Sequence, residues 1–467
     1  MSWEPIIGLE IHVQLKTRTK MFCRCETSFG DPENTHTCPI CLAHPGTLPI
    51  PNRQAIEWTV KLGLALGCEI APRAVFHRKN YFYPDLPKGY QISQYDAPLC
   101  AGGRFVVPHD GRDHAVGIVR AHLEEDAART VHVAGAGGRI VGATRSLVDF
   151  NRGGTPLVEI VTQPDIRSAE EATWFLRLLR QTVVELGISD AEMEKGTLRC
   201  DVNVSVRAAG ETGLRTRWEL KNMNSFTFIG RGIEAAIREQ IAIHERGGEV
   251  VQETYDYDAE RDTLTPHRTK EEAEDYRYFP EPDLVPVVPE GSLIDRLRAE
   301  LPEPPGARIR RLEAALDHET AVGLVTTGRA GLYEGAVAAG ADATDAANVV
   351  MNAFAATGRD PGSVDPGEFA KLLGARGRIT RAAFEEAVRL VGAEPIDHLL
   401  EEVAISEASE LAPLIDAVLA ANLAEVEHYR AGKQGLLGFF VGQVMKQTKG
   451  KADPKTVNEL LRERLSA

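Results

Sequence analysis

The sequence contains no apolar run long enough to span a membrane, because charged residues interrupt its alanine- and leucine-rich stretches. Its first residues show no basic segment followed by an apolar stretch, which argues against a secretory signal. It also lacks a glycine-rich Walker sequence, so a P-loop is excluded as the means of binding a nucleotide. From these absences we expect a cytoplasmic protein that makes no contact with membranes.

Aromatic residues are few, at 6% of 467, whereas the hydrophobic fraction of 43% and the charged fraction of 26% are ordinary for a globular protein. The seven cysteines are an odd number, which favours a reducing compartment over a disulfide framework. The net charge of −15 is only weak evidence against nucleic-acid binding, because a local basic surface can operate on an acidic protein.

Four cysteines near the N-terminus form two close pairs, Cys23 with Cys25 and Cys38 with Cys41, separated by a turn-rich spacer. This spacing can bring four thiolates to one tetrahedral Zn²⁺. Four thiolates leave no open coordination position, so we expect a structural rather than a catalytic zinc site. The alternative is four reduced cysteines without a metal.

Strands and helices are intermixed over the first 290 or so residues without regular βαβ spacing, which predicts a large, mainly antiparallel α+β domain. Alternation of polar and apolar residues predicts strands at residues 7–15, 116–126 and 198–207. Helices are predicted at residues 53–66, 169–186 and 230–246, the second of them capped by Ser168 with Glu171.

A proline-rich passage at residues 280–305 marks a boundary, beyond which the chain is strongly helical. We therefore predict a catalytic α+β domain at 1–293, an all-α helical domain at 294–405 and a small basic helical tail domain at 406–467. In the tail, one helix is predicted to pack through positions 437, 440, 441, 444 and 445.

Polar side chains share one face of the first predicted strand, where Glu10, His12 and Gln14 alternate with apolar neighbours. Three further segments repeat this alternation: residues 120–126, 198–207 and 218–222. If these strands are neighbours, their polar faces form a floor that suits a nucleotide with Mg²⁺. Carboxylates and histidine would hold the metal, and arginine and lysine would neutralise phosphate. The alternative is a solvated sheet face with salt bridges.

Two turn-rich segments could approach an anion. In the aromatic and basic segment 77–91, Lys88 and Gly89 stand at a turn that could bring backbone and ammonium close to a phosphate. Residues 149–159 are predicted to form a hairpin, which could present Arg152 to an anion. Each segment is a weak signal by itself.

Together these residues resemble the B subunits of bacterial aspartyl/glutamyl-tRNA(Asn/Gln) amidotransferases, the GatB/GatE family. The resemblance runs essentially from end to end of the chain and is carried by long, unusual strings of sequence. These strings are residues 8–15, 81–95, 122–127, 149–159 and 275–283.

The resemblance implies an ATP-dependent reaction on Glu-tRNA(Gln) or Asp-tRNA(Asn). The side-chain carboxylate of the aminoacyl group is phosphorylated, and ammonia then displaces phosphate to give the amide. A carboxylate needs this activation because oxide is a poor leaving group, and bringing two anions together requires a metal and basic groups. The resemblance also implies a first domain shaped as a cradle related to the glutamine synthetase fold, which is an analogy at the level of fold.

Site residues follow from the resemblance. Glu10, His12 and Glu124 are the expected Mg²⁺ ligands. The expected nucleotide or phosphate contacts are Tyr81, Lys88, Arg199 and Asn203. Lys79 and Glu125 are expected to guide ammonia into the site, where Glu125 could take up a proton. The zinc cluster is expected to be structural.

The resemblance implies a heterotrimer with two partners. One is an amidase-type glutaminase, which would release ammonia and pass it through a channel, and the other is a small third protein that clamps the pair. The only thiol on the polar-faced strands, Cys200, is predicted to be buried and is unsuited to releasing ammonia. The basic tail is expected to contact aminoacyl-tRNA through Lys446, Lys449 and Lys451.

Two other functions remain open at this point. The chain could be a zinc-containing tRNA-binding module without enzymatic activity, which predicts no affinity for a nucleotide. It could instead be an assembly scaffold for an amidase partner, which predicts that the basic tail is dispensable for tRNA binding.

Overall fold

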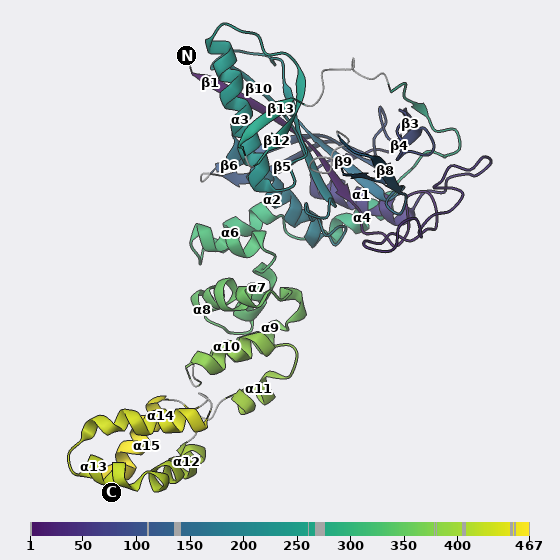
Figure 1. Cartoon of the computed structure of the whole chain (residues 1–467). Helices are drawn as coiled ribbons and strands as arrows, with labels where there is room; N and C mark the ends of the chain where they lie inside the picture. Colours follow the sequence, from purple (N-terminus) through teal and green to yellow (C-terminus); the bar gives the residue numbers. More distant parts are fainter. Residues whose placement is uncertain are drawn as a thin grey trace. The chain divides into compact units, whose positions relative to one another are not determined.

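The computed structural model describes residues 2–109, 112–134, 142–259, 261–266, 276–377, 379, 381–403, 408–448, 452 and 454–466. The chain folds as two compact units, Met1–Ala307 and Arg308–Ala467 (Figure 1). The first unit is built on a large sheet with helices, and the second is helical, so the mixed character predicted from the sequence is confirmed. The finer division at 293 and 405 stays a prediction. None of the described helices is long and apolar enough to cross a membrane.

A nine-stranded sheet forms the centre of the first unit within the described ranges, in the order β13-β12-β11-β10-β1-β9-β6-β5-β2. Its strands are β1 (Trp3–Gln14), β2 (Glu69–Ile70), β5 (Cys100–His109), β6 (Arg112–Glu125), β9 (Pro156–Thr162), β10 (Leu198–Ala208), β11 (Trp218–Lys221), β12 (Glu253–Asp258) and β13 (Thr263–Pro266). Neighbouring strands run antiparallel except β11 and β12, which are parallel. The three predicted strands correspond to β1, β6 and β10.

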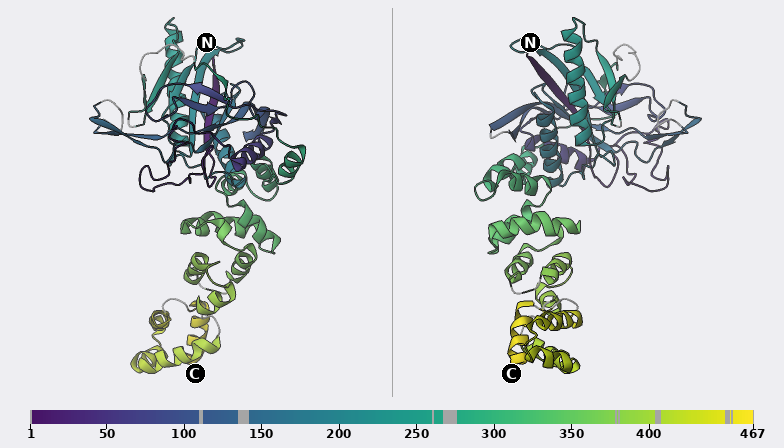
Figure 2. Two further views of the ribbon diagram at one scale, coloured as in Figure 1. Left: turned by 90° about the vertical axis from the view of Figure 1, so that its right-hand side faces the viewer. Right: turned by 60° about the vertical axis from the view of Figure 1, so that its left-hand side comes forward.

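Three helices cover the apolar face of this sheet: α1 (Arg53–Ala65), α2 (Ala169–Glu185) and α3 (Phe226–Glu245). On α1, the carbonyl oxygen of Thr59 accepts from Cys100 Sγ of β5 at 3.5 Å. Phe175 of α2 meets Phe105 of β5 edge to face, with ring centroids 5.5 Å apart. Figure 2 shows the long helix α3 lying along the sheet, where its Gln240 donates to the carbonyl of Val204. The helices leave the polar face of the central strands free for a site.

Serine caps fix the residues at which helices α2 and α3 begin. The Ser168 hydroxyl accepts from the backbone N–H of Glu171, as the predicted cap requires, while the Glu171 carboxylate accepts from the backbone N–H of Arg167. Helix α3 begins at Phe226 rather than at 230, because Ser225 caps it through the N–H of Phe228. A fourth helix of this unit, α4 (Gly291–Ala299), lies beside α1 in Figure 1 and is joined to it by the ion pair Arg296–Glu57.

Two smaller sheets are also present among the described residues of the first unit. A three-stranded sheet has the order β14-β3-β4, with β14 (Phe279–Pro280), β3 (His77–Asn80) and β4 (Tyr90–Ser93). A two-stranded ribbon pairs β7 (Arg129–Val133) with β8 (Arg145–Asp149). The predicted hairpin at 149–159 was wrong, because β8 pairs with β7 whereas β9 is inserted between β1 and β6.

The second unit is a succession of short helices. They are α6 (His318–Thr326), α7 (Ala330–Ala338), α8 (Ala343–Asn348), α9 (Pro366–Ala375), α10 (Arg381–Leu390), α11 (Ile396–Val403), α12 (Ala408–Ala421), α13 (Leu423–Arg430), α14 (Leu437–Gln447) and α15 (Pro454–Ser466), and α5 (Pro305–Leu312) spans the division between the units. Helix α8 continues into a π-helical turn at Val349–Phe354.

The tail has a core of its own, formed by α12–α15. The core residues are Leu411, Ile415, Val418, Val426, Phe440, Val444, Ala452, Val457, Leu461 and Leu465. On α14, Phe440 and Val444 are fully buried, and Leu437, Val441 and Met445 pack against them. The predicted packing stripe of this helix is confirmed.

Candidate active site

The register of the central strands brings polar residues from distant parts of the chain onto one face. In β1, Glu10 lies opposite Asp201 of β10, and His12 lies opposite both Arg199 of β10 and Glu159 of β9. Glu159 in turn lies opposite His122 of β6. Because side chains alternate along a strand, these partners all point to the face that the helices leave uncovered. The floor of polar groups expected from the sequence is therefore assembled.

A carboxylate–imidazole cluster lies at the middle of this floor. His12 Nε2 is 3.5 Å from Glu159 Oε2 and 3.9 Å from Glu124 Oε1. One ligand atom from each of the three residues lies within 4.8 Å of the others. The hydroxyl of Ser93 in β4 donates to Glu124 Oε2 at 3.0 Å, so the small sheet reaches the cluster. Two carboxylates and an imidazole at this spacing can hold a divalent cation.

Burial and mutual charge set the protonation of the cluster. Burial raises the pKa of Glu124, and the charge of Glu159 raises it further. Burial also works against ionisation of Glu159, but its hydrogen bond to His12 and the charges of His12 and Lys79 lower its pKa overall. The pair thus shares its negative charge unequally, as expected for two carboxylates in one site.

A second imidazole lies behind the two carboxylates. His122 is almost wholly buried, and burial lowers its pKa to about 4. Arg120 Nε donates to His122 Nδ1 at 3.3 Å, which leaves Nε2 to carry the proton. That Nε2 faces Glu159 Oε2 at 3.7 Å and Glu124 Oε2 at 3.8 Å. A neutral imidazole of this tautomer directs its N–H toward both carboxylates, at distances longer than a hydrogen bond.

Glu10 lies on the same face of the sheet as the cluster. It does not belong to the group of ligand atoms that His12, Glu124 and Glu159 bring together. Its Oε1 accepts from Asn203 Nδ2 at 3.0 Å. Burial, followed by the charge of Glu159, raises the pKa of Glu10, so its carboxylate is coupled to the cluster. Sequence reasoning missed Glu159. The signal was a lone acid in the apolar run of β9, Pro156–Thr162, a run that was interpreted as one arm of a hairpin.

Arg199 borders the cluster on the β10 side. Its Nη2 donates to Asp126 Oδ1 at 3.1 Å, and Asp126 also accepts from Gln14. Burial disfavours the guanidinium charge, but Asp126 outweighs this and raises the pKa of Arg199. Among the described residues, its buried Nε has no hydrogen-bond partner. An unpaired guanidinium N–H inside a polar site is suited to an anionic oxygen. Arg152, by contrast, donates to the carbonyls of Ala127 and Ala128.

Lys79 lies on β3, in the small sheet that reaches the cluster through Ser93. Burial disfavours its charge, but neighbouring groups, led by Glu124, together outweigh this and raise the pKa of Lys79. Its Nζ lies 4.8 Å from the ring centroid of Tyr276 and 5.9 Å from that of Tyr81. Lys79 and Tyr81 are thus brought together beside the carboxylates.

Glu125 lies next to Glu124 in sequence but faces the opposite way, because side chains alternate along β6. Its Oε1 accepts from the backbone N–H of Ile92 at 3.0 Å and pairs with Lys88 Nζ. These two residues line a cavity of about 180 Å³, which Lys20, Cys23 and Cys41 also line. Lys88 and Glu125 therefore form a pair separate from the His12 cluster.

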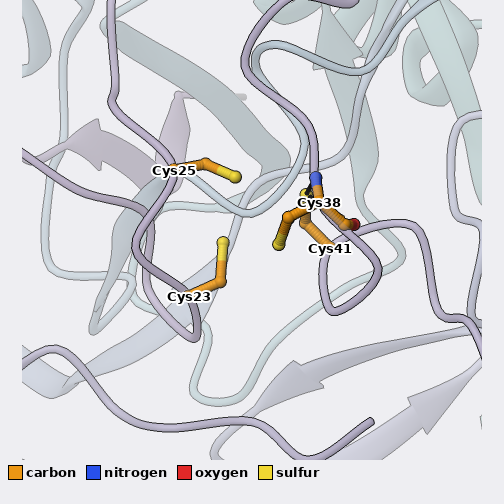
Figure 3. Close-up of side chains that lie close together, drawn as sticks. All are labelled: Cys23, Cys25, Cys38 and Cys41. Atoms are coloured by element: carbon orange, nitrogen blue, oxygen red, sulfur yellow. Dashed lines mark hydrogen bonds between the residues drawn. The ribbon is translucent and has the colours of Figure 1, made fainter.

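The four N-terminal cysteines converge as the spacing predicts (Figure 3). Their sulfur atoms all lie within 4.8 Å of one another, and Cys38 Sγ is 3.9 Å from Cys41 Sγ. A Zn–S bond of about 2.3 Å in a tetrahedron places sulfurs about 3.8 Å apart. A hydrogen bond with Cys23 lowers the pKa of Cys41 most strongly. The positive charge of Lys20 lowers it further. The residues fit a metal such as zinc.

In the basic tail, Lys446 lies exposed in the last turn of α14. Lys449 and Lys451, which were also expected to contact tRNA, lie outside the described residues.

Comparison with known proteins gives a consistent result. Residues 5–295 match the GatB/GatE catalytic domain, and residues 331–465 match the GatB domain. The chain is 47% identical over 485 residues to the B subunit of the aspartyl/glutamyl-tRNA(Asn/Gln) amidotransferase of Anaeromyxobacter dehalogenans, covering 99% of each chain. It is 48% identical over 481 residues to the protein of the same name from Moorella thermoacetica, and 47% over 485 residues to that from Geobacter sulfurreducens, with full coverage of both chains in each case.

Proposed function

The chain belongs to the GatB/GatE family, and on this basis we propose that it is the B subunit of a tRNA-dependent amidotransferase. Its substrate is Glu-tRNA(Gln) or Asp-tRNA(Asn). An oxygen of the side-chain carboxylate attacks the γ-phosphorus of ATP, giving an acyl phosphate and ADP. Ammonia then attacks the acyl carbon, phosphate leaves, and loss of a proton gives the amide.

The observation that carries this proposal is the convergence of His12, Glu124 and Glu159, with Lys79 and Arg199 nearby. Two anions must meet in this reaction, so their repulsion has to be offset inside a site with little water. Mg²⁺ held by His12, Glu124 and Glu159, with Glu10 alongside, would supply part of the positive charge. The unpaired Nε of Arg199 supplies a donor for a phosphate oxygen.

The remaining site residues take the roles that their surroundings favour. Asn203, which donates to Glu10, and Tyr81, whose ring lies near Lys79, contribute to nucleotide binding. Lys88 contributes too, once its pairing with Glu125 is released. Lys79 and Glu125 guide ammonia, and Glu125 accepts the proton that makes the incoming species neutral. The four cysteines hold a structural Zn²⁺.

The broader assembly is part of the same proposal. Ammonia comes from an amidase-type glutaminase, a small third protein completes the heterotrimer, and the reaction takes place in the cytoplasm. The first domain, 1–293, is a cradle related to glutamine synthetase. The helical domain, 294–405, and the tail, 406–467, extend from it. The tail binds tRNA through Lys446, Lys449 and Lys451.

A reconstitution with the glutaminase and the small third protein, misacylated tRNA, ATP and labelled glutamine tests the division of labour. Glu124→Gln should abolish amide formation while glutamine is still hydrolysed, because Glu124 belongs to the phosphorylation site. Added ammonia should not rescue this variant. Loss of glutamine hydrolysis alone, with added ammonia used normally, would contradict the proposal. A wild-type chain that binds tRNA but not Mg²⁺-ATP would instead indicate a non-enzymatic RNA-binding module.

A further inference from the structure

Six aromatic rings form a continuous row over the small sheet. Its order is Tyr83, Tyr81, Tyr276, Tyr278, Tyr95 and His77. Each ring contacts the next, with centroids between 4.3 and 6.4 Å apart. Tyr278 and Tyr95 are stacked almost parallel, at 4.3 Å and 9°.

The row is unusual for this chain. The sequence has ten tyrosines, and five of them lie in this row. Core packing does not account for the row, because Tyr83 is 61% exposed and Tyr95 is 52% exposed. Exposed aromatic rings set close together are suited to a planar partner.

Lys79 connects the row to the carboxylate–imidazole cluster. Its Nζ lies over the Tyr276 and Tyr81 rings, in the middle of the row, and the charges of Glu124 and Glu159 help to raise its pKa. A ligand whose end lies over the Tyr276 and Tyr81 rings is therefore beside the residues proposed to activate a carboxylate. Lys79 also gives the row a positive charge, which matches a phosphodiester backbone.

We propose that this tyrosine row is a stacking platform for the unpaired nucleotides at the 3′ end of the RNA substrate, and that it holds the esterified amino acid at the carboxylate–imidazole cluster. The inference rests on the proposed function, which requires an aminoacylated RNA end to reach this cluster. Bases of a single strand stack on aromatic side chains without regard to sequence, and nearby basic groups hold the backbone. A row of several rings suits several successive bases, whereas ATP offers a single base.

The test compares two RNA duplexes of equal length with the full-length chain. One has a short unpaired 3′ end with 2-aminopurine at its last position, and the other is blunt. The variant Tyr83→Leu/Tyr95→Leu removes two exposed rings, and Phe29→Leu is the control, because Phe29 is 71% exposed and outside the row. Fluorescence anisotropy measures affinity, and 2-aminopurine quenching reports stacking.

The wild type should bind the RNA with the unpaired end more tightly than the blunt RNA and quench its fluorescence. The double variant should lose the quenching and bind that RNA about tenfold more weakly. Its affinity for the blunt RNA should match that of the wild type, and Phe29→Leu should change neither value.

Two results would overturn the inference. The first is equal wild-type affinity for both RNAs without quenching. The second is a double variant that loses affinity for Mg²⁺-ATP but not for the unpaired end, which would assign the rings to the base of ATP. Neither readout requires amide formation, so a failure of the proposed reaction can be told apart from a failure of this platform.

Discussion

Replacing Phe440 by alanine should selectively destabilise the tail. Phe440 is fully buried at the centre of the core that runs from Leu411 to Leu465. Truncating a buried phenylalanine costs about 3–5 kcal/mol, because apolar contacts are lost and a cavity remains. A folded segment of roughly 55 residues has only about 3–8 kcal/mol of stability in total. The substitution should therefore remove a large part, or all, of the stability of the tail.

Phe439 provides a matched control on the same helix, because its side chain is 37% exposed. Phe439→Ala should cost no more than about 1 kcal/mol. Hydrogen exchange of the amides of α12, α14 and α15 measures both losses directly, with the amides of the central sheet as an internal reference. In Phe440→Ala only the tail amides should exchange faster.

The same pair tests the role of the tail. Phe440→Ala should weaken tRNA binding and leave Mg²⁺-ATP binding at the first unit unchanged, whereas Phe439→Ala should retain a folded tail. Equal protection losses in the two variants, or a loss below about 1 kcal/mol in Phe440→Ala, would refute the assignment of Phe440 to an independent core.

Two further predictions concern metals. Cys41→Ser should lower the zinc content measured by native mass spectrometry and increase proteolysis around residues 23–41. The control Cys200→Ala should keep the wild-type zinc content. A full complement of zinc in Cys41→Ser would contradict the four-cysteine site. Glu159→Gln should weaken Mn²⁺ binding at least tenfold, and Glu10→Gln should weaken it less, because Glu159 but not Glu10 converges with His12 and Glu124. Titration followed by electron paramagnetic resonance measures both affinities. A larger loss in Glu10→Gln would favour the ligand set expected from the sequence.

The faces of individual strands could be predicted from the sequence, but their neighbours could not. The alternation around His12 in β1 and around Asp201 in β10 shows which side chains share a face, because the period of a strand is fixed. Nothing in that alternation specifies that β9 is inserted between β1 and β6. Pairing between strands depends on contacts across long stretches of chain, and this is why Glu159 was missed although it lies opposite His12.

Local chemistry predicted other features well. The cysteine spacing indicated a four-sulfur cluster, and the sulfur atoms do converge. The apolar period of α14 identified its buried stripe, because helix geometry alone decides which residues share a face. The hairpin at 149–159 failed for the opposite reason. The turn residues of this segment favour a reversal of the chain, but β8 pairs with β7, which precedes it in the sequence.

The position of Lys20 has a consequence for how the chain matures. This lysine is 1% exposed, and its Nζ lies 3.7 Å from Cys41 Sγ and donates to the carbonyl of Phe150. Zinc with four thiolates carries a formal charge of about −2, so the ammonium offsets half of it. Without the metal, the four sulfurs are no longer tied together, and Cys41, whose pKa is lowered, is left to balance the enclosed cation. Newly synthesised chains should therefore complete this region only when they capture zinc, and zinc-starved cells should accumulate a form open to proteases there.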